Sequence, residues 1–121
     1  MPTELPVAAL KAELFKALAH PARVRALEKL VIGELSVGEL AELLDIEIAQ
    51  LSQQLAVLRK AGVVATRREG NTIFYSVRDP RLSRLLAVAR EMLVSNLQDS
   101  QAILASLEAE QAQGSLRGNA R

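Results

Sequence analysis

The spacing of apolar residues between positions 36 and 61 predicts two short helices joined by a tight turn. Ser36 and Glu39 have the spacing of a capping box, which opens the first helix. The apolar stripe of this helix consists of Leu40, Leu43 and Leu44. After an interruption at 45–46, leucine recurs at i, i+4 and i+7 in a second helix, at Leu51, Leu55 and Leu58. Gly62 is placed to end that helix, so residues 36–61 are typical of a helix-turn-helix.

The residues that follow predict a β-hairpin. The runs 63–68 and 72–77 are rich in β-branched and aromatic residues, and they flank the short sequence Glu69-Gly70-Asn71. Helix, turn, helix and hairpin in this order define a winged helix-turn-helix, with residues 63–78 as the wing. The expected fold class is mainly α with a small β-hairpin.

Two further helices are predicted before the helix-turn-helix. Pro6 opens the first, which runs to Leu18 with an apolar stripe at Leu10, Leu14, Phe15 and Leu18. His20-Pro21 interrupts the pattern, because the residue before proline avoids the helical region. Pro21 then begins a second helix that reaches about Val31 and ends before Gly33.

A long helix is predicted at the C-terminal end. Asp79-Pro80 has the form of an N-cap followed by proline at the first helical position, and residues 80–113 contain no helix breaker before Gly114. We expect one domain over residues 1–113 and a flexible tail over 114–121. One small domain cannot cover so long an apolar stripe, so we expect a homodimer through the first and last helices. The predicted interface residues are Leu10, Leu14, Leu86, Leu93, Leu97 and Leu104.

Composition narrows the class of protein. The chain has 121 residues, 50% of them hydrophobic and 24% charged, which is typical of a folded domain. It lacks a membrane-length apolar run and a signal-peptide pattern, so we expect a cytoplasmic protein without membrane contact. The net charge is only +1, but residues 47–78 carry five basic and two acidic side chains. This basic segment coincides with the second helix of the motif and the wing, as contact with phosphate requires.

Three sequence blocks together resemble the ArsR/SmtB family of bacterial winged-helix repressors. They are LFKALAHPARVRALEKL, GELSVGELAELL and LSQQLAVLRKAGVVATRREGNTIFYSV, and they cover roughly residues 14–77. The resemblance implies a homodimer that binds double-stranded DNA at an operator dyad. It also implies release from DNA when a metal ion or another signal is sensed.

The metal-binding residues of that family are replaced in this chain. Where relatives carry a Cys-x-Cys pair, the stretch ELSVGEL has Ser36 and Gly38, which cannot replace two thiolate ligands. The last helix contains no histidine, and its carboxylates at Asp79, Glu91 and Asp99 are scattered. We therefore expect no metal site and no cofactor. His20 is interpreted as a helix-boundary residue with a local hydrogen bond; a hard-ligand metal site with Glu13 is the alternative.

The candidate DNA-binding residues follow from chemistry and helix geometry. They are Ala49, Gln50, Ser52, Gln53, Gln54 and Lys60 on the second helix of the motif, with Arg67, Arg68, Asn71 and Thr72 in the wing. Glutamine can pair with adenine edges, and the wing residues suit contact with the DNA backbone or minor groove. Glu47 stands where the family usually has a small N-cap serine; it caps poorly and repels phosphate.

The leading hypothesis is a homodimeric transcriptional regulator, most simply a repressor. Without thiols, its release from DNA suits a small effector or a sensing partner protein better than a family-type metal switch. The alternative is a protein-interaction regulator whose DNA binding or signal sensing depends on such a partner. An enzyme is not expected, because the sequence shows no nucleophile–base pair, phosphate loop or metal cluster.

Overall fold

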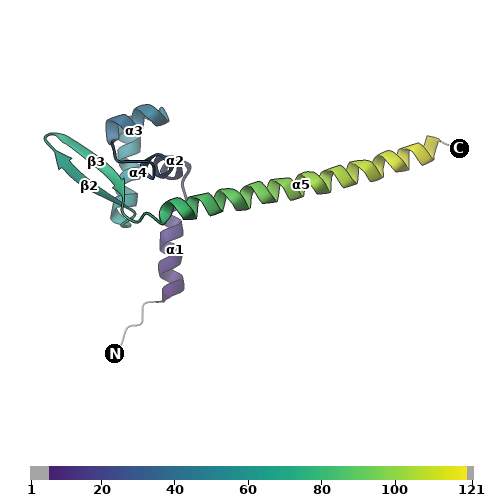
Figure 1. Cartoon of the computed structure of the whole chain (residues 1–121), viewed down its shortest axis with the longest axis horizontal. Helices are drawn as coiled ribbons and strands as arrows, with labels where there is room; N and C mark the ends of the chain where they lie inside the picture. The colour runs from purple at the N-terminus through teal and green to yellow at the C-terminus, as the bar shows by residue number, and fades with distance from the viewer. Residues whose placement is uncertain (1–5, 120–121) are drawn as a thin grey trace. The chain divides into compact units, whose positions relative to one another are not determined.

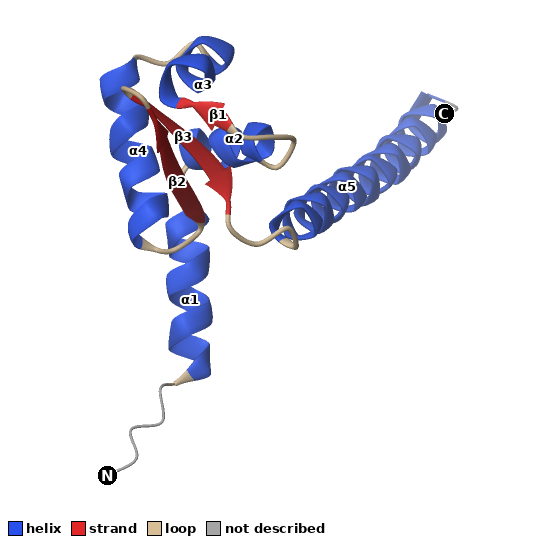
Figure 2. Ribbon diagram, turned by 60° about the vertical axis from the view of Figure 1, so that its left-hand side comes forward, coloured by secondary structure: helices blue, strands red, loops and turns tan. Residues whose placement is uncertain are grey.

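The chain forms two compact units, with the boundary in the sequence between Ser83 and Arg84, and each is described by itself. The computed structural model describes the backbone of residues 6–119 and the side chains of residues 6–114. The first unit contains every strand of this region and all of its helices but one (Figures 1 and 2). The expectation of a single domain over residues 1–113 stays a prediction.

The helix-turn-helix forms as predicted. Its helices are α3 (Val37–Leu44) and α4 (Ile48–Lys60), and they pack against each other and against α2. The capping box is confirmed, since the Glu39 amide donates to Ser36 Oγ at 3.1 Å and the Ser36 amide donates to Glu39 Oε1 at 3.2 Å. Leu40, Leu44, Leu51, Leu55 and Leu58 are all buried. Leu43 is exposed, contrary to prediction, and Ala41 is buried instead.

Two residues with positive φ end the helices of the motif. Asp45 closes α3 with φ +53°, and the Ile46 amide donates to the Ala41 carbonyl five residues earlier. Gly62 follows α4 with φ +77°, and the Val63 amide donates in the same way to the Leu58 carbonyl. This is the Schellman arrangement, which satisfies carbonyls that a helix end leaves free. The predicted role of Gly62 is confirmed.

The wing belongs to a small antiparallel sheet with strand order β1-β3-β2. Its hairpin pairs β2 (Val64–Glu69) with β3 (Thr72–Val77), with Glu69 opposite Thr72 next to the loop. Gly70 has φ +61°, the sign that a type II′ turn requires at its first loop position. The two-residue strand β1 (Leu35–Ser36) was not predicted; it pairs with Tyr75 and Phe74. A strand of two residues is too short to show the alternation of apolar and polar residues by which strands are predicted from sequence.

The two N-terminal helices differ in how much of their apolar surface is covered. Helix α2 (Pro21–Leu30) buries Ala26, Leu27 and Leu30 in the core. Helix α1 (Val7–Leu18) begins after Pro6 and buries only Ala17 and Leu18 at its C-terminal end. The large apolar residues nearer its start are exposed: Val7, Leu10, Leu14 and Phe15.

The second unit consists of most of α5 (Leu82–Asn119), a helix of 38 residues. It begins later than predicted, because Asp79, Pro80 and Arg81 form a tighter turn with bonds from Leu82 and Ser83 to carbonyls three residues earlier. It also continues through Gly114, which was predicted to end it and to begin a flexible tail. A single glycine costs a helix only about 1 kcal/mol relative to alanine, and Gly114 has no positive φ. In the described region no helix has the length and hydropathy to span a bilayer.

Candidate nucleic-acid interface

The face of α4 opposite its leucines is open to solvent and polar. Ala49, Gln50 and Gln53 are exposed, and Ser52 is half-buried beside them. The burial of the leucine face fixes this orientation, because side chains at i and i+4 lie on one side of a helix. Four of the predicted residues are therefore brought together over the first two turns of α4. Their amide and hydroxyl groups can donate to and accept from base edges.

Gln54 lies apart from this face. Its Oε1 accepts a hydrogen bond from Arg23 Nε of α2 at 2.8 Å, and its side chain is half-buried. Arg23 also donates through Nη1 to the carbonyls of Lys16 and Ala17, at 3.3 and 3.0 Å. One guanidinium thus joins the C-terminal end of α1 to α4. The structure assigns Gln54 to the support of α4, and the sequence held no signal for its partner 31 residues earlier.

Glu47 stands at the N-cap of α4 without capping it. Its side chain makes no hydrogen bond to the first amides of the helix, and it is exposed. A carboxylate at this end is attracted by the helix dipole but fits the cap geometry poorly. It also places a negative charge beside the exposed face of α4.

We predict that Glu47→Ser stabilises the protein by about 1 kcal/mol, because serine caps a helix well and glutamate leaves these amides without a partner. It should also tighten binding to every duplex at low salt, since one negative charge near phosphate is removed. Urea unfolding and binding titrations measure the two effects. Glu47→Gln is the control, because it removes the charge but adds no cap. Equal stability of the serine and glutamine variants would contradict the capping argument.

The two wing arginines are in different situations. Arg67 Nε donates to both carboxylate oxygens of Glu34 at 2.8 and 2.9 Å, and its Nη2 lies 2.6 Å from Oε1. Its Nη1 donates to Glu69 at 2.9 Å, and Cζ lies 4.5 Å from the centre of the Phe74 ring.

The hydrogen bond from Arg67 lowers the pKa of Glu34, while both carboxylates raise the pKa of Arg67. Among the residues that the structure describes, Arg68 donates only to the Gly70 carbonyl, at 3.1 Å.

The other predicted wing residues lie at the tip of the hairpin. Asn71 is in the two-residue loop and Thr72 begins β3, and both are exposed. Together with Arg68 they form a polar tip whose one arginine pairs with no carboxylate among the described side chains of residues 6–114. Arg67 is set apart from this group by Glu34 and Glu69.

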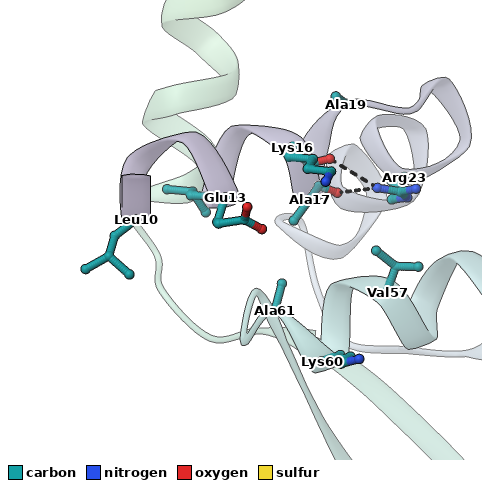
Figure 3. Close-up of a pocket in the computed structure, with 10 residues that line it drawn as sticks. Leu10, Glu13, Lys16, Ala17, Ala19, Arg23, Val57, Lys60 and Ala61 are labelled. Atoms are coloured by element: carbon teal, nitrogen blue, oxygen red, sulfur yellow. Dashed lines mark hydrogen bonds between the residues drawn. The ribbon is translucent and has the colours of Figure 1, made fainter. Parts of the chain in front are cut away.

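Lys60 lies in the last turn of α4, about 10 Å along the helix from Gln53. It lines a groove of about 830 Å³ between α1 and the end of α4, together with Val57 and Ala61 (Figure 3). Leu10 and Glu13 of α1 line the same groove. Lys60 is therefore not gathered with the residues at the start of α4, although it was predicted to act with them.

His20 caps α2. Its Nδ1 accepts a hydrogen bond from the Ala22 amide at 3.0 Å, and Pro21 occupies the first position of the helix. The predicted structural role is confirmed. Among residues 6–119, no three histidine, aspartate or glutamate side chains are grouped to hold a metal ion.

The fold and this surface define a winged helix-turn-helix DNA-binding protein: a capped two-helix motif, a hairpin after its second helix, and an exposed polar face on that second helix. Residues 20–66 match the family described as "bacterial regulatory protein, arsR family". The chain belongs to this family of bacterial transcriptional regulators, which is a non-enzymatic class.

Close relatives agree with this assignment. The uncharacterised HTH-type transcriptional regulator Rv0081 of Mycobacterium tuberculosis is 54% identical over 105 residues, which span 86% of this chain and 92% of the relative. Its crystal structure matches with a TM-score of 0.71, covering 79% of this chain and 97% of that one. The biofilm growth-associated repressor of Agrobacterium fabrum is 48% identical over 89 residues, spanning 69% of this chain and 76% of the relative.

A third similar structure comes from Mycobacterium bovis. It is the solution structure of the homodimeric winged helix-turn-helix DNA-binding domain of Mb0332, a possible ArsR-family regulator. The match has a TM-score of 0.69 at 26% identity, and it covers 81% of this chain and 94% of that one.

Proposed function

We propose that this protein is a homodimeric, sequence-specific regulator, most simply a repressor, that reads an inverted repeat in duplex DNA. The observation that carries the proposal is the exposed face of α4, where Gln50 and Gln53 stand clear of the core, in a fold whose wing bears the exposed Arg68. A helix of this kind fits the major groove, and the wing reaches the neighbouring backbone.

Homodimer formation is supported by apolar surface that a single chain leaves exposed. Leu10 and Leu14 of α1 are exposed, as are Leu93, Leu97 and Leu104 of α5. Leu86, the remaining predicted interface residue, is half-buried. The solved relative Mb0332 is a homodimer, and the Agrobacterium relative is a repressor. Two copies would present two α4 helices to half-sites roughly 34 Å apart.

The release signal is proposed to be a small organic effector or a sensing partner protein. The sequence contains no cysteine and one histidine, and that histidine is engaged as the cap of α2. The family's thiolate metal sites need cysteine ligands, and this sequence has none. A protein that bound duplex only with such a partner would instead fit the alternative, a partner-dependent regulator.

The experiment that tests the proposal separates base reading from phosphate contact. Duplexes selected from a random pool are titrated with protein over a range of salt concentrations, alongside scrambled duplex. Gln53→Ala should lower the ratio of specific to scrambled affinity by about 5- to 150-fold per half-site, the 1–3 kcal/mol of a bidentate base contact. Arg68→Ala should weaken all sequences similarly and reduce the salt slope by about 0.9 per protomer.

Gln54→Ala is the matched control for Gln53→Ala. It removes the same side chain from the adjacent position, where the structure shows a bond to Arg23, so it should lower stability more than discrimination. Equal binding of selected and scrambled duplex at all salt concentrations would remove the specific-regulator proposal. A larger loss of discrimination in Gln54→Ala than in Gln53→Ala would reverse the assignment of the two residues.

A further inference from the structure

Glu34 brings a negative charge to the wing from a distant part of the sequence. It lies in the connection between α2 and β1, 33 residues before Arg67, and its carboxylate contacts both Nε and Nη2 of that arginine. This paired geometry matches the fork of a guanidinium and is stronger than a single contact. Arg67, which the sequence predicts to contact DNA, is therefore already bound to a carboxylate of the protein itself.

The other sides of Arg67 are also occupied. Glu69, two residues along β2, accepts from Nη1, and the Phe74 ring lies against the guanidinium plane. The side chain of Arg67 is still 51% exposed, so solvent and phosphate can approach it. A phosphate would meet two carboxylates beside the one cation. Arg67, Glu34 and Glu69 together carry a net charge of −1, which repels the DNA backbone.

We propose that Glu34 is a specificity-determining residue that competes with DNA phosphate for Arg67. This inference rests on the proposed function, because it assigns the roles within the DNA-binding wing. Glu34 holds Arg67 as a positioning residue that fixes the wing against the connection before β1. Arg68 then supplies the phosphate contact of the hairpin. The consequence is lower affinity for duplex of any sequence, which leaves more of the binding to the base-reading face of α4.

The test compares Glu34→Gln with wild type in salt titrations on selected and scrambled duplex. Glutamine keeps the shape but cannot form the ion pair, so Nε and Nη2 of Arg67 become available to phosphate while Nη1 keeps its contact with Glu69. The salt slope should then steepen by about 0.9 per protomer, or 1.8 per dimer. Scrambled duplex should bind on the order of tenfold more tightly at 0.15 M salt, and the specificity ratio should fall.

Two further variants show whether the gain passes through Arg67. The double variant Glu34→Gln with Arg67→Ala should lose the extra slope. Glu28→Gln is the matched control, because it removes the same charge from an exposed position on α2. An equal gain in Glu28→Gln would show an effect of net charge alone and would overturn the proposal. The proposal would also be overturned if Arg67→Ala, as a single change, reduced the salt slope as much as Arg68→Ala does.

A measurement without DNA separates this proposal from the proposed function. In nuclear magnetic resonance spectra of the free protein, the Arg67 Nε–H should exchange with water more slowly in wild type than in Glu34→Gln, because the Glu34 carboxylate protects it. An unprotected Arg67 in wild type would overturn the competition whatever the DNA titrations show. A protected Arg67 in a protein that binds no duplex would instead overturn the proposed function, and the competitor role with it.

Discussion

Replacing Leu97 by glutamate should convert the protein to a monomer and abolish binding to an inverted repeat. Leu97 is 64% exposed in the single chain, so glutamate costs the isolated chain little, and both residues favour helix. In a dimer through α5, however, the same position would bury an unpaired charge from each copy. We expect the dimer dissociation constant to rise by at least about 100-fold, and the affinity for the dyad to fall by a similar factor.

Analytical ultracentrifugation and duplex titration measure these two changes. Ser95→Glu is the matched control, because it adds the same charge to α5 about 200° around the helix from Leu97. It should leave the dimer and its DNA affinity nearly unchanged. A Leu97→Glu variant that stays dimeric at micromolar concentration would exclude the middle of α5 from the interface.

Truncating Leu55 to alanine should destabilise the first unit by about 2–5 kcal/mol. Leu55 has no exposed surface and lies on the face of α4 that packs on the core. The loss combines reduced burial of apolar surface with a cavity that the surrounding helices cannot fully close. A domain of this size has a total stability of about 5–15 kcal/mol, so a substantial part of it would disappear.

Urea unfolding followed by circular dichroism measures the loss. Leu43→Ala is the matched control, because the same substitution removes a leucine that is 58% exposed on α3. It should cost at most about 1 kcal/mol. Similar losses for the two variants would contradict the packing described for the helix-turn-helix.

Local sequence signals predicted most of the first unit. Ser36 and Glu39, Gly62, and the leucines of α4 each act within a few residues, and each has the predicted role. Local signals were less reliable where two of them competed. Gly114 was read as a stop, but the strong helix formers before it outweigh the small cost of one glycine, and α5 continues to Asn119.

The candidate site was predicted in outline but not in detail. The exposed positions of α4 follow from helical periodicity, which identified Gln50 and Gln53 correctly as solvent-facing. The partners of Gln54 and Arg67 come from residues 31 and 33 positions away. Side chains that reach across the fold leave no periodic pattern in the sequence.

The sequence by itself determined the order of the helices and of the two wing strands, the capping of α3, the polar face of α4 and the absence of thiol ligands. These properties depend on residue type and short-range spacing. The tertiary structure decided which polar side chains are bound to other groups of the protein and which remain available for contact with DNA. It joined Gln54 to Arg23 and Arg67 to Glu34, because only folding brings such distant groups within hydrogen-bond distance.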